Sequence, residues 1–244
     1  MKKKYWLVVT VYVAMQLSSL IGVPITAWIE KSMGYSQKTI QSTSGAYWIV
    51  FSFIAALIVI LSILRDEMKD TMYRKEAAPI PVSIAWAIGG VFLSLFAQGL
   101  AGNIERLIGI KPGSDNTQQI IHLIEAVPLV IIVSSVVGPI LEEIVFRKII
   151  FGGLYRRFNF FISAIISSVI FGLVHGEPSH LLLYSAMGFS FAFLYVRTKR
   201  IVVPIFAHVS MNTLVVMVQI VFRDDIQKMV THSERVQGFI GGFL

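Results

Sequence analysis

Long apolar runs alternate with short polar segments along the whole chain. A helix that crosses the ~30 Å hydrocarbon core of a bilayer needs roughly 20 residues, and seven runs approach or exceed that length. They cover about 5–29, 45–64, 80–102, 127–150, 158–175, 181–196 and 201–222. The pattern predicts an all-α, polytopic transmembrane helix bundle of about seven spans. A short extra or re-entrant element near 115–126 or 236–244 would make eight.

The composition excludes several classes of protein. Of the 244 residues, 55% are hydrophobic and only 14% are charged, whereas soluble domains carry about 25% charged residues. A soluble domain, a disordered chain and a coiled coil are therefore excluded, and an integral membrane protein is predicted. The chain has no cysteine, so disulfides and thiolate metal sites are excluded as well.

The basic residues flank the apolar runs and predict the topology. Although the net charge is +7, its position beside membrane spans favours anionic lipid headgroups over nucleic acid as the partner. Alternate segments, counted from the N-terminal tail, hold 14 of the 21 Lys and Arg residues. The positive-inside rule then places the N-terminus in the cytoplasm. Short connections and a Lys-rich start suit a multi-pass protein of the bacterial plasma membrane.

The charged and histidine residues inside the apolar runs are concentrated in the second half of the chain, which suggests a division into three parts. Residues 1–120 resemble generic N-terminal transmembrane helices, about three spans. Residues 121–225 hold about four spans with three polar clusters and form the predicted functional core, while 226–244 is a short C-terminal tail. An ionisable side chain at mid-bilayer costs about 2.5–3.5 kcal/mol even on the lenient insertion scale, so each cluster needs a reason.

The spacing within each cluster indicates what it can do. Glu143 and Arg147 are i,i+4 on a helix and can form a salt bridge, whereas Glu142 lies about 100° round the helix and need not join that pair. One carboxylate is then neutralised and the other stays free for chemistry. His208 and Asn212 are also i,i+4, so they project together as neighbouring hydrogen-bond donors.

The depths of the clusters can be estimated from the chain. Glu142 and His175 lie at similar distances from the turn between their runs, whereas His208 comes out about two helical turns closer to the cytoplasm at ~5.4 Å per turn. Pro139 and Pro204 each lie four residues before a cluster residue and can kink their helices there. A purely structural interpretation stays open, because Glu–Arg pairs and Asn side chains also join membrane helices.

Three motifs in this order resemble the CPBP family of intramembrane proteases. They are Glu142-Glu143-x-x-x-Arg147, Phe171-x-x-x-His175 and His208-x-x-x-Asn212. The family includes the type II CAAX prenyl endopeptidases and bacterial proteins linked to bacteriocin self-immunity and peptide processing. The resemblance covers about 125–220, and all the motif residues are present.

The resemblance implies hydrolysis of a peptide bond within or near the membrane. On that basis Glu142 is the general base and His175 helps to hold the water. His208 and Asn212 stabilise the oxyanion, while Glu143 and Arg147 orient the site.

The need for a metal is left open by the resemblance, because family members have been described both as metalloproteases and as glutamate proteases. Glu142, His175 and His208 are the candidate zinc ligands. The offset in depth favours catalysis without an obligatory metal, with zinc as the alternative.

A hydrophobic or lipid-modified peptide or protein is the expected substrate, and membrane lipids are the other expected partner. Two further functions remain as alternatives. Buried carboxylates and histidines also build proton relays, so a proton-coupled transporter is one alternative. A non-catalytic membrane protein, such as an immunity or scaffold protein, is the other. The sequence leaves the oligomeric state open.

Overall fold

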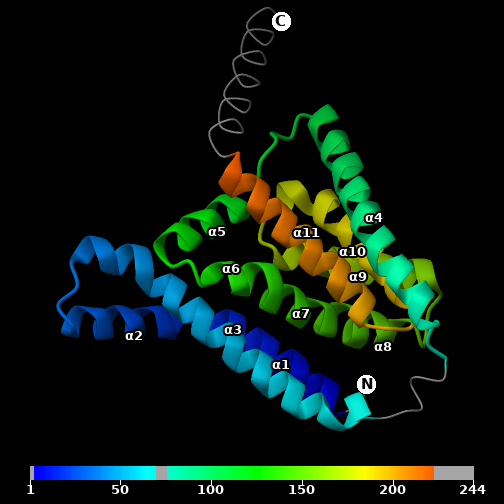
Figure 1. The fold of residues 1–244 in the computed structure, drawn as a ribbon, viewed down its shortest axis with the longest axis horizontal. Coiled ribbons are helices and arrows are strands. Elements are labelled where there is room, and N and C mark those ends of the chain that lie inside the picture. The colour runs from blue at the N-terminus through cyan, green and yellow to red at the C-terminus, as the bar shows by residue number, and fades with distance from the viewer. Residues whose placement is uncertain (1–2, 70–75, 223–244) are drawn as a thin grey trace, which may run out of the picture.

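The computed structural model describes residues 3–69 and 76–222, and every regular element in these two ranges is a helix (Figure 1). The predicted all-α class is therefore confirmed. The predicted C-terminal tail 226–244, together with the extra element expected near 236–244, lies outside the described residues.

The first expected span consists of two helices with a bend between them. α1 (Lys3–Leu17) and α2 (Ser19–Ser32) meet at 47°. At the bend, the Ser18 hydroxyl donates to a carbonyl of the preceding turn and accepts from Trp48 Nε1 at 3.0 Å. Such a back-bonded serine bends a helix. Gly22 allows the Trp48 ring to pack against the backbone of α2, where a Cβ would overlap the ring.

The long helix α3 (Gln37–Lys69) returns along both of these helices. Figure 1 shows α2 and the first part of α3 extending as an arm, with α1 beside the second part of α3. The buried Glu30 carboxylate closes the arm, because its two oxygens accept hydrogen bonds from Thr43 and Ser44, each at 2.5 Å.

The second half of the chain forms a bundle around α10. α10 packs against α4 on one side and α9 on another, and α11 packs against α4 and α10. α5 is a short amphipathic helix that occupies the segment in which the sequence allows an extra element. The bounds are α4 (Ile80–Leu107), α5 (Asp115–Ala126), α9 (Phe160–Val174), α10 (Leu181–Thr198) and α11 (Val202–Val221).

A continuous helical stretch over residues 130–154 carries the first polar motif. Two π-helical segments, η2 and η3, interrupt it, and the second begins at Glu143. Such segments are rare and recur at functional sites. Pro139 follows η2 and removes a backbone donor from the ladder, which is a local reason for the irregular hydrogen bonding. The bounds are α6 (Val130–Ile132), η2 (Val133–Val137), α7 (Gly138–Glu142), η3 (Glu143–Phe151) and α8 (Gly152–Leu154).

Helix length and composition support fewer spans than the seven predicted. Four helices within the described residues are long and apolar enough to cross a membrane, or five if α1 and α2 together count as one span. α9 has 15 residues, and the expected span 127–150 is divided into short segments that carry four charged side chains. The count of seven is therefore not confirmed, and the cytoplasmic N-terminus stays a prediction.

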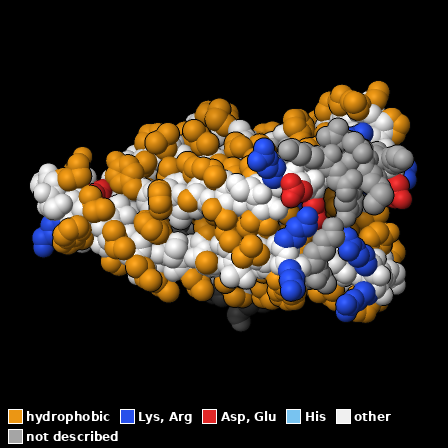
Figure 2. Space-filling view, turned by 90° about the horizontal axis from the view of Figure 1, so that it is seen from below, with side chains coloured by type: hydrophobic (Ala, Val, Ile, Leu, Met, Phe, Trp, Pro, Cys, Tyr) orange, Lys and Arg blue, Asp and Glu red, His pale blue; other side chains and the backbone are white. Residues whose placement is uncertain are grey.

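On the face shown in Figure 2, most of the charged side chains gather toward one end of the molecule. Figure 2 shows Lys, Arg, Asp and Glu gathered where α1 begins and α3 ends, beside a largely apolar surface. There, Glu67 of α3 binds Lys4 of α1 (2.7 Å) and Lys148 of η3 (3.3 Å), and it accepts a hydrogen bond from the Tyr5 hydroxyl (3.0 Å). These contacts link α1 and α3 to η3, the segment that contains Glu143 and Arg147.

One buried apolar cluster joins the N-terminal helices to the predicted core. It includes Val8 of α1, Ile60 of α3, Phe146 of η3 and Phe191 of α10. Because lipid is as apolar as these side chains, close packing rather than burial from water is the main stabilising contribution inside a membrane. The predicted division at residue 120 falls within α5 and stays a prediction.

Candidate active site

Glu143, Arg147 and His208 form a fully buried group at the centre of the bundle. One Glu143 oxygen, Oε2, lies 3.1 Å from Arg147 Nε, and the other, Oε1, lies 2.9 Å from His208 Nδ1. The exposed fractions of these side chains are 0%, 0% and 1%. A carboxylate oxygen accepts, so Nδ1 of His208 carries the hydrogen. The buried carboxylate thus links η3 to α11.

The Arg147 guanidinium lies among aromatic rings. Its Cζ is 4.3 Å from the Phe171 ring centroid and 5.3 Å from that of Phe191. Its contact with Glu143 is an ion pair without hydrogen-bond geometry, and Nη1 and Nη2 have no hydrogen-bond partner among the described residues. Each cation–π contact in such a desolvated place contributes up to about 2 kcal/mol. The positive charge is therefore stabilised by one carboxylate and by ring faces.

His208 lies level with the carboxylate pair, and the expected offset of two turns is wrong. Its Nε2 is 3.7 Å from Glu142 Oε2, while its ring stacks on Phe191 with centroids 4.5 Å apart. The expected offset assumes straight α-helices with a constant rise. The π-helical segments on either side of Glu142 break that assumption, so counting residues misplaces the levels.

Glu142 differs from its neighbour in the chain. Its side chain is 19% exposed and lines a cavity of about 800 Å³. The same cavity is lined by His175, His208 and Asn212. The structure therefore brings the three sequence motifs to one cavity, with Glu142 rather than Glu143 accessible from it.

His175 lies where α9 ends, with its ring held on several sides. Nδ1 contacts the Phe171 carbonyl at 2.8 Å, and the Phe171 ring lies edge-on at 4.5 Å. The other contact is a stack on Tyr184, with centroids 4.1 Å apart and planes at 24°. A carbonyl only accepts, so Nδ1 carries the hydrogen, and in the neutral ring Nε2 is an acceptor. Asn212, one turn after His208, donates to the Ser134 carbonyl at 3.3 Å.

Comparison with known proteins identifies the family. A family model described as type II CAAX prenyl endopeptidase Rce1-like matches residues 124–214. A Bacillus subtilis (strain 168) protein named "Putative membrane peptidase YdiL" is 54% identical over 221 residues, covering 90% of this chain and 91% of that protein. The chain belongs to the CAAX protease family. It is therefore an integral membrane protein of a peptidase family, as the three motifs indicate.

A second relative supports the same assignment. The "Membrane-embedded CAAX protease MroQ" of Staphylococcus aureus (strain USA300) is 31% identical over 231 residues, covering 91% of each chain. No solved structure matches the chain significantly. The matched segment 124–214 contains every motif residue and leaves out α1 to α4.

The candidate ligands Glu142, His175 and His208 are of the residue types that bind zinc. Their side chains do not converge on one point, however. Both motif histidines use Nδ1 in a hydrogen bond and leave Nε2, the arrangement typical of metal-ligating histidines. However, within 3–69 and 76–222 no three His, Asp or Glu side chains are grouped closely enough to hold a metal ion. The need for a metal stays an open prediction.

Two tyrosines at the site are not among the residues that the sequence predicts. Tyr12 of α1 is buried, meets the Phe146 ring edge-on at 5.9 Å, and lines the cavity with Glu142. Tyr184 of α10 covers His175. Nothing in the sequence indicates that either tyrosine lies at the site, because a tyrosine in an apolar run fits a lipid-facing position and a core position equally well.

Proposed function

We propose that this CAAX protease family member is an intramembrane endopeptidase that hydrolyses a peptide bond in a hydrophobic or lipid-modified peptide or protein. The observation that carries the proposal is the contrast between the adjacent carboxylates. Glu143 is buried against Arg147, whereas Glu142 opens into a cavity shared with His175. Ionisable groups kept within a membrane bundle mark functional sites, and here the accessible one faces the space for a substrate.

The chemistry requires a water held between two acceptors. The Glu142 carboxylate and Nε2 of neutral His175 each accept one of its hydrogens, which leaves an oxygen lone pair for the peptide carbonyl carbon. Glu142 takes the proton as the new C–O bond forms. The same proton then passes to the leaving nitrogen as the C–N bond breaks, so the carboxylate is regenerated.

His208 and Asn212 would stabilise the negative oxygen that forms on the substrate. His208 has Glu143 on Nδ1 and Glu142 near Nε2, at 2.9 and 3.7 Å. As a donor to that oxygen His208 would use Nε2, which lies on the Glu142 side of its ring, and Asn212 would donate from its amide, one helical turn later in the wall of the same cavity.

A metal-independent mechanism is part of the proposal, with zinc as the alternative. In the alternative, Glu142 and the Nε2 atoms of His175 and His208 would be the residues that hold the ion. Zinc would supply Lewis-acid polarisation and a more acidic bound water.

The cavity supports a peptide substrate of mixed character. Its walls carry apolar side chains such as Met15 and Phe53, together with amide side chains such as Gln16 and Gln98. Apolar walls suit hydrophobic side chains, and the amides suit the donors and acceptors of a peptide backbone. We place the protein in the bacterial plasma membrane, with its N-terminus cytoplasmic, about seven spans, and membrane lipids rather than nucleic acid as partners.

A reconstituted cleavage assay tests the proposal. Purified protein in liposomes is incubated with a panel of fluorogenic hydrophobic and lipidated peptides, and cleavage sites are read by mass spectrometry. Cleavage by wild type and not by Glu142→Gln is expected. Proton-driven flux without cleavage would replace the proposal by a transporter, and neither activity would favour a scaffold role.

A further inference from the structure

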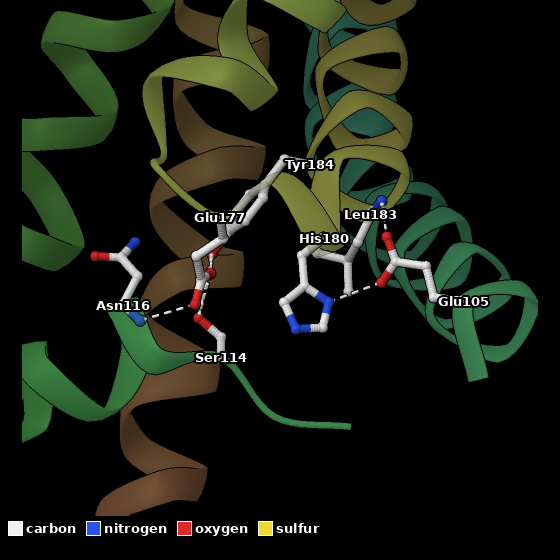
Figure 3. A network of polar contacts seen from close by, with 7 residues as sticks. All are labelled: Glu105, Ser114, Asn116, Glu177, His180, Leu183 and Tyr184. Carbon is white, nitrogen blue, oxygen red and sulfur yellow. Dashed lines mark hydrogen bonds and ion pairs between the residues drawn. The ribbon is translucent and has the colours of Figure 1, made fainter. Parts of the chain in front are cut away.

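We propose that Tyr184 and Glu177 are positioning residues that hold the His175 ring and fasten the start of α5 to it. The inference rests on the proposed function of the His175 site. Neither residue belongs to the three sequence motifs. Glu177 lies on the short segment that follows His175, and Tyr184 lies in the first turn of α10; Glu177 contacts both Tyr184 and the start of α5 (Figure 3).

The first contact fixes the plane of the His175 ring. Tyr184 lies nearly parallel to it, at 24° and 4.1 Å between centroids, and the Phe171 ring meets it edge-on. The Nδ1 bond to the Phe171 carbonyl then selects the orientation within that plane. Together these contacts fix the position of Nε2, the atom that would hold the water. Precise placement matters, because a displacement of 1 Å at a reacting group can lower the rate about 10²-fold.

The second contact fixes Tyr184 itself. Its hydroxyl donates to Glu177 Oε2 at 2.6 Å, a short bond to a carboxylate and therefore a strong one. Gly176, with φ of 73°, turns the chain sharply between His175 and Glu177, so that the carboxylate reaches back to α10. A residue with a Cβ is strained at that φ. The turn at Gly176 thus lets Glu177 hold the Tyr184 hydroxyl, and Tyr184 in turn stacks on the His175 ring.

The same carboxylate also holds the start of α5. Oε2 accepts from the Ser114 hydroxyl at 2.8 Å, and Oε1 accepts from the Asn116 backbone N–H at 2.9 Å. Ser114 also caps α5 by accepting from the Thr117 N–H. Asn116 and Thr117 line the cavity. Glu177 therefore connects the start of α5, which forms part of the cavity wall, to Tyr184 and through it to the His175 ring.

The far end of the segment has a separate anchor. The buried Glu105 of α4 contacts His180 Nδ1 at 2.8 Å and accepts the Leu183 N–H at 2.9 Å. Figure 3 shows this pair beside the Glu177 group, with Glu105 reaching from α4 to the start of α10. The segment between α9 and α10 is thus held at both ends, by Glu177 near its start and by Glu105 at its far end.

Glu177 is ionised under ordinary conditions. Burial opposes its charge, but the hydrogen bonds from Tyr184, Asn116 and Ser114 outweigh burial and hold its pKa below the usual value. An ionised carboxylate is the form that can accept all three bonds, which agrees with the geometry.

Graded variants of Tyr184 test the positioning role. Tyr184→Phe keeps the stacked ring and loses the bond to Glu177, whereas Tyr184→Leu loses both. We expect kcat to fall roughly 3–10-fold in the first and on the order of 10²-fold in the second, with KM changed less than twofold. Tyr195→Phe, on the same helix but away from the cavity, is the matched control and should keep wild-type kcat. Glu177→Gln should lower kcat at least as much as Tyr184→Phe, because it weakens the bonds from Ser114 and Asn116 as well as the bond from Tyr184.

A readout that is independent of turnover separates this inference from the proposed function. The ring ¹⁵N signals of His175 are recorded in ¹⁵N-histidine-labelled protein and assigned by their loss in His175→Gln. We expect these signals to move or broaden in Tyr184→Leu and to move less in Tyr184→Phe. Unchanged His175 signals, or a loss confined to KM or folded yield, would overturn the positioning role. If no peptide is cleaved by wild type while the signals respond as expected, the positioning stands and the proposed function fails.

Discussion

Glu142 and Glu143 are adjacent in the chain and lie in opposite environments. The Glu143 side chain is fully buried between Arg147 and His208, whereas the Glu142 side chain is 19% exposed and faces the cavity, with Oε2 3.7 Å from His208 Nε2. The local helix geometry separates them, because neighbouring side chains on a helix diverge by about 100°. One carboxylate therefore balances a buried charge while the other can reach a substrate.

Glu142→Gln should strongly reduce turnover and leave stability unchanged. The amide keeps the shape of the side chain but cannot take a proton, so we expect cleavage to fall by about 10²-fold or more. Peptide cleavage and thermal unfolding in detergent are measured on the same preparation. Glu143→Gln is the comparison: it should lower the unfolding temperature as well as the activity. Wild-type cleavage by Glu142→Gln would contradict the assignment.

Arg147→Ala should destabilise the fold strongly. Removing the guanidinium leaves Glu143 as a buried charge beside empty space, at a cost of about 3–5 kcal/mol. Arg147→Lys should not restore stability fully, because an ammonium lacks the planar group that lies on Phe171 and Phe191. The control is Lys148→Ala at the next position, where a partly exposed pair with Glu67 is lost at a cost of about 1 kcal/mol or less. Equal unfolding temperatures for Arg147→Ala and Lys148→Ala would count against the buried pair.

Asn212→Leu should reduce kcat more than it changes KM. Loss of one donor to a developing oxyanion costs about 10²–10³-fold in kcat, and the bond from Asn212 to the Ser134 carbonyl is long enough, at 3.3 Å, to contribute little to folding. Thr213→Val is the neighbouring control, because Thr213 bonds within its own helix on an exposed face. A change in KM alone would assign Asn212 to substrate binding instead.

Metal removal distinguishes the two forms of the mechanism. We expect protein exhaustively treated with a chelator to keep its cleavage rate, because the proposed water is held by protein side chains alone. Elemental analysis of the active preparation accompanies the assay. One zinc per chain, whose removal abolishes cleavage and whose return restores it, would establish the metal-dependent alternative.

Glu177 should make the protein less stable in acid. Its pKa in the folded state lies below the ordinary value of 4.5, so the unfolded chain binds a proton more readily. The stabilisation is complete above pH 4.5 and is lost as the pH falls through the lower, folded-state pKa. Thermal unfolding between pH 6 and pH 3 should therefore show a steeper decline for wild type than for Glu177→Gln. Parallel curves would show that the carboxylate does not couple to folding.

Local spacing along the chain is enough to determine part of the site. The apolar runs predict an all-helical membrane protein, and the spacing of four residues predicts that Glu143, rather than Glu142, meets Arg147. Both inferences concern neighbours within one helix, where a regular rise and turn relate sequence to space. The motif order indicates the family for the same reason: it is a pattern along the chain.

Only the tertiary structure decided how the segments meet. Residue counting misplaces the level of His208 because π-helical segments change the path of the chain beside Glu142, and the long first run is bent at Ser18. The stack of Tyr184 on His175 and the bonds from Glu177 to α5 join residues as much as 63 positions apart. Hydrophobic periodicity carries no information on such pairs, because many partners satisfy one buried polar group and packing selects among them.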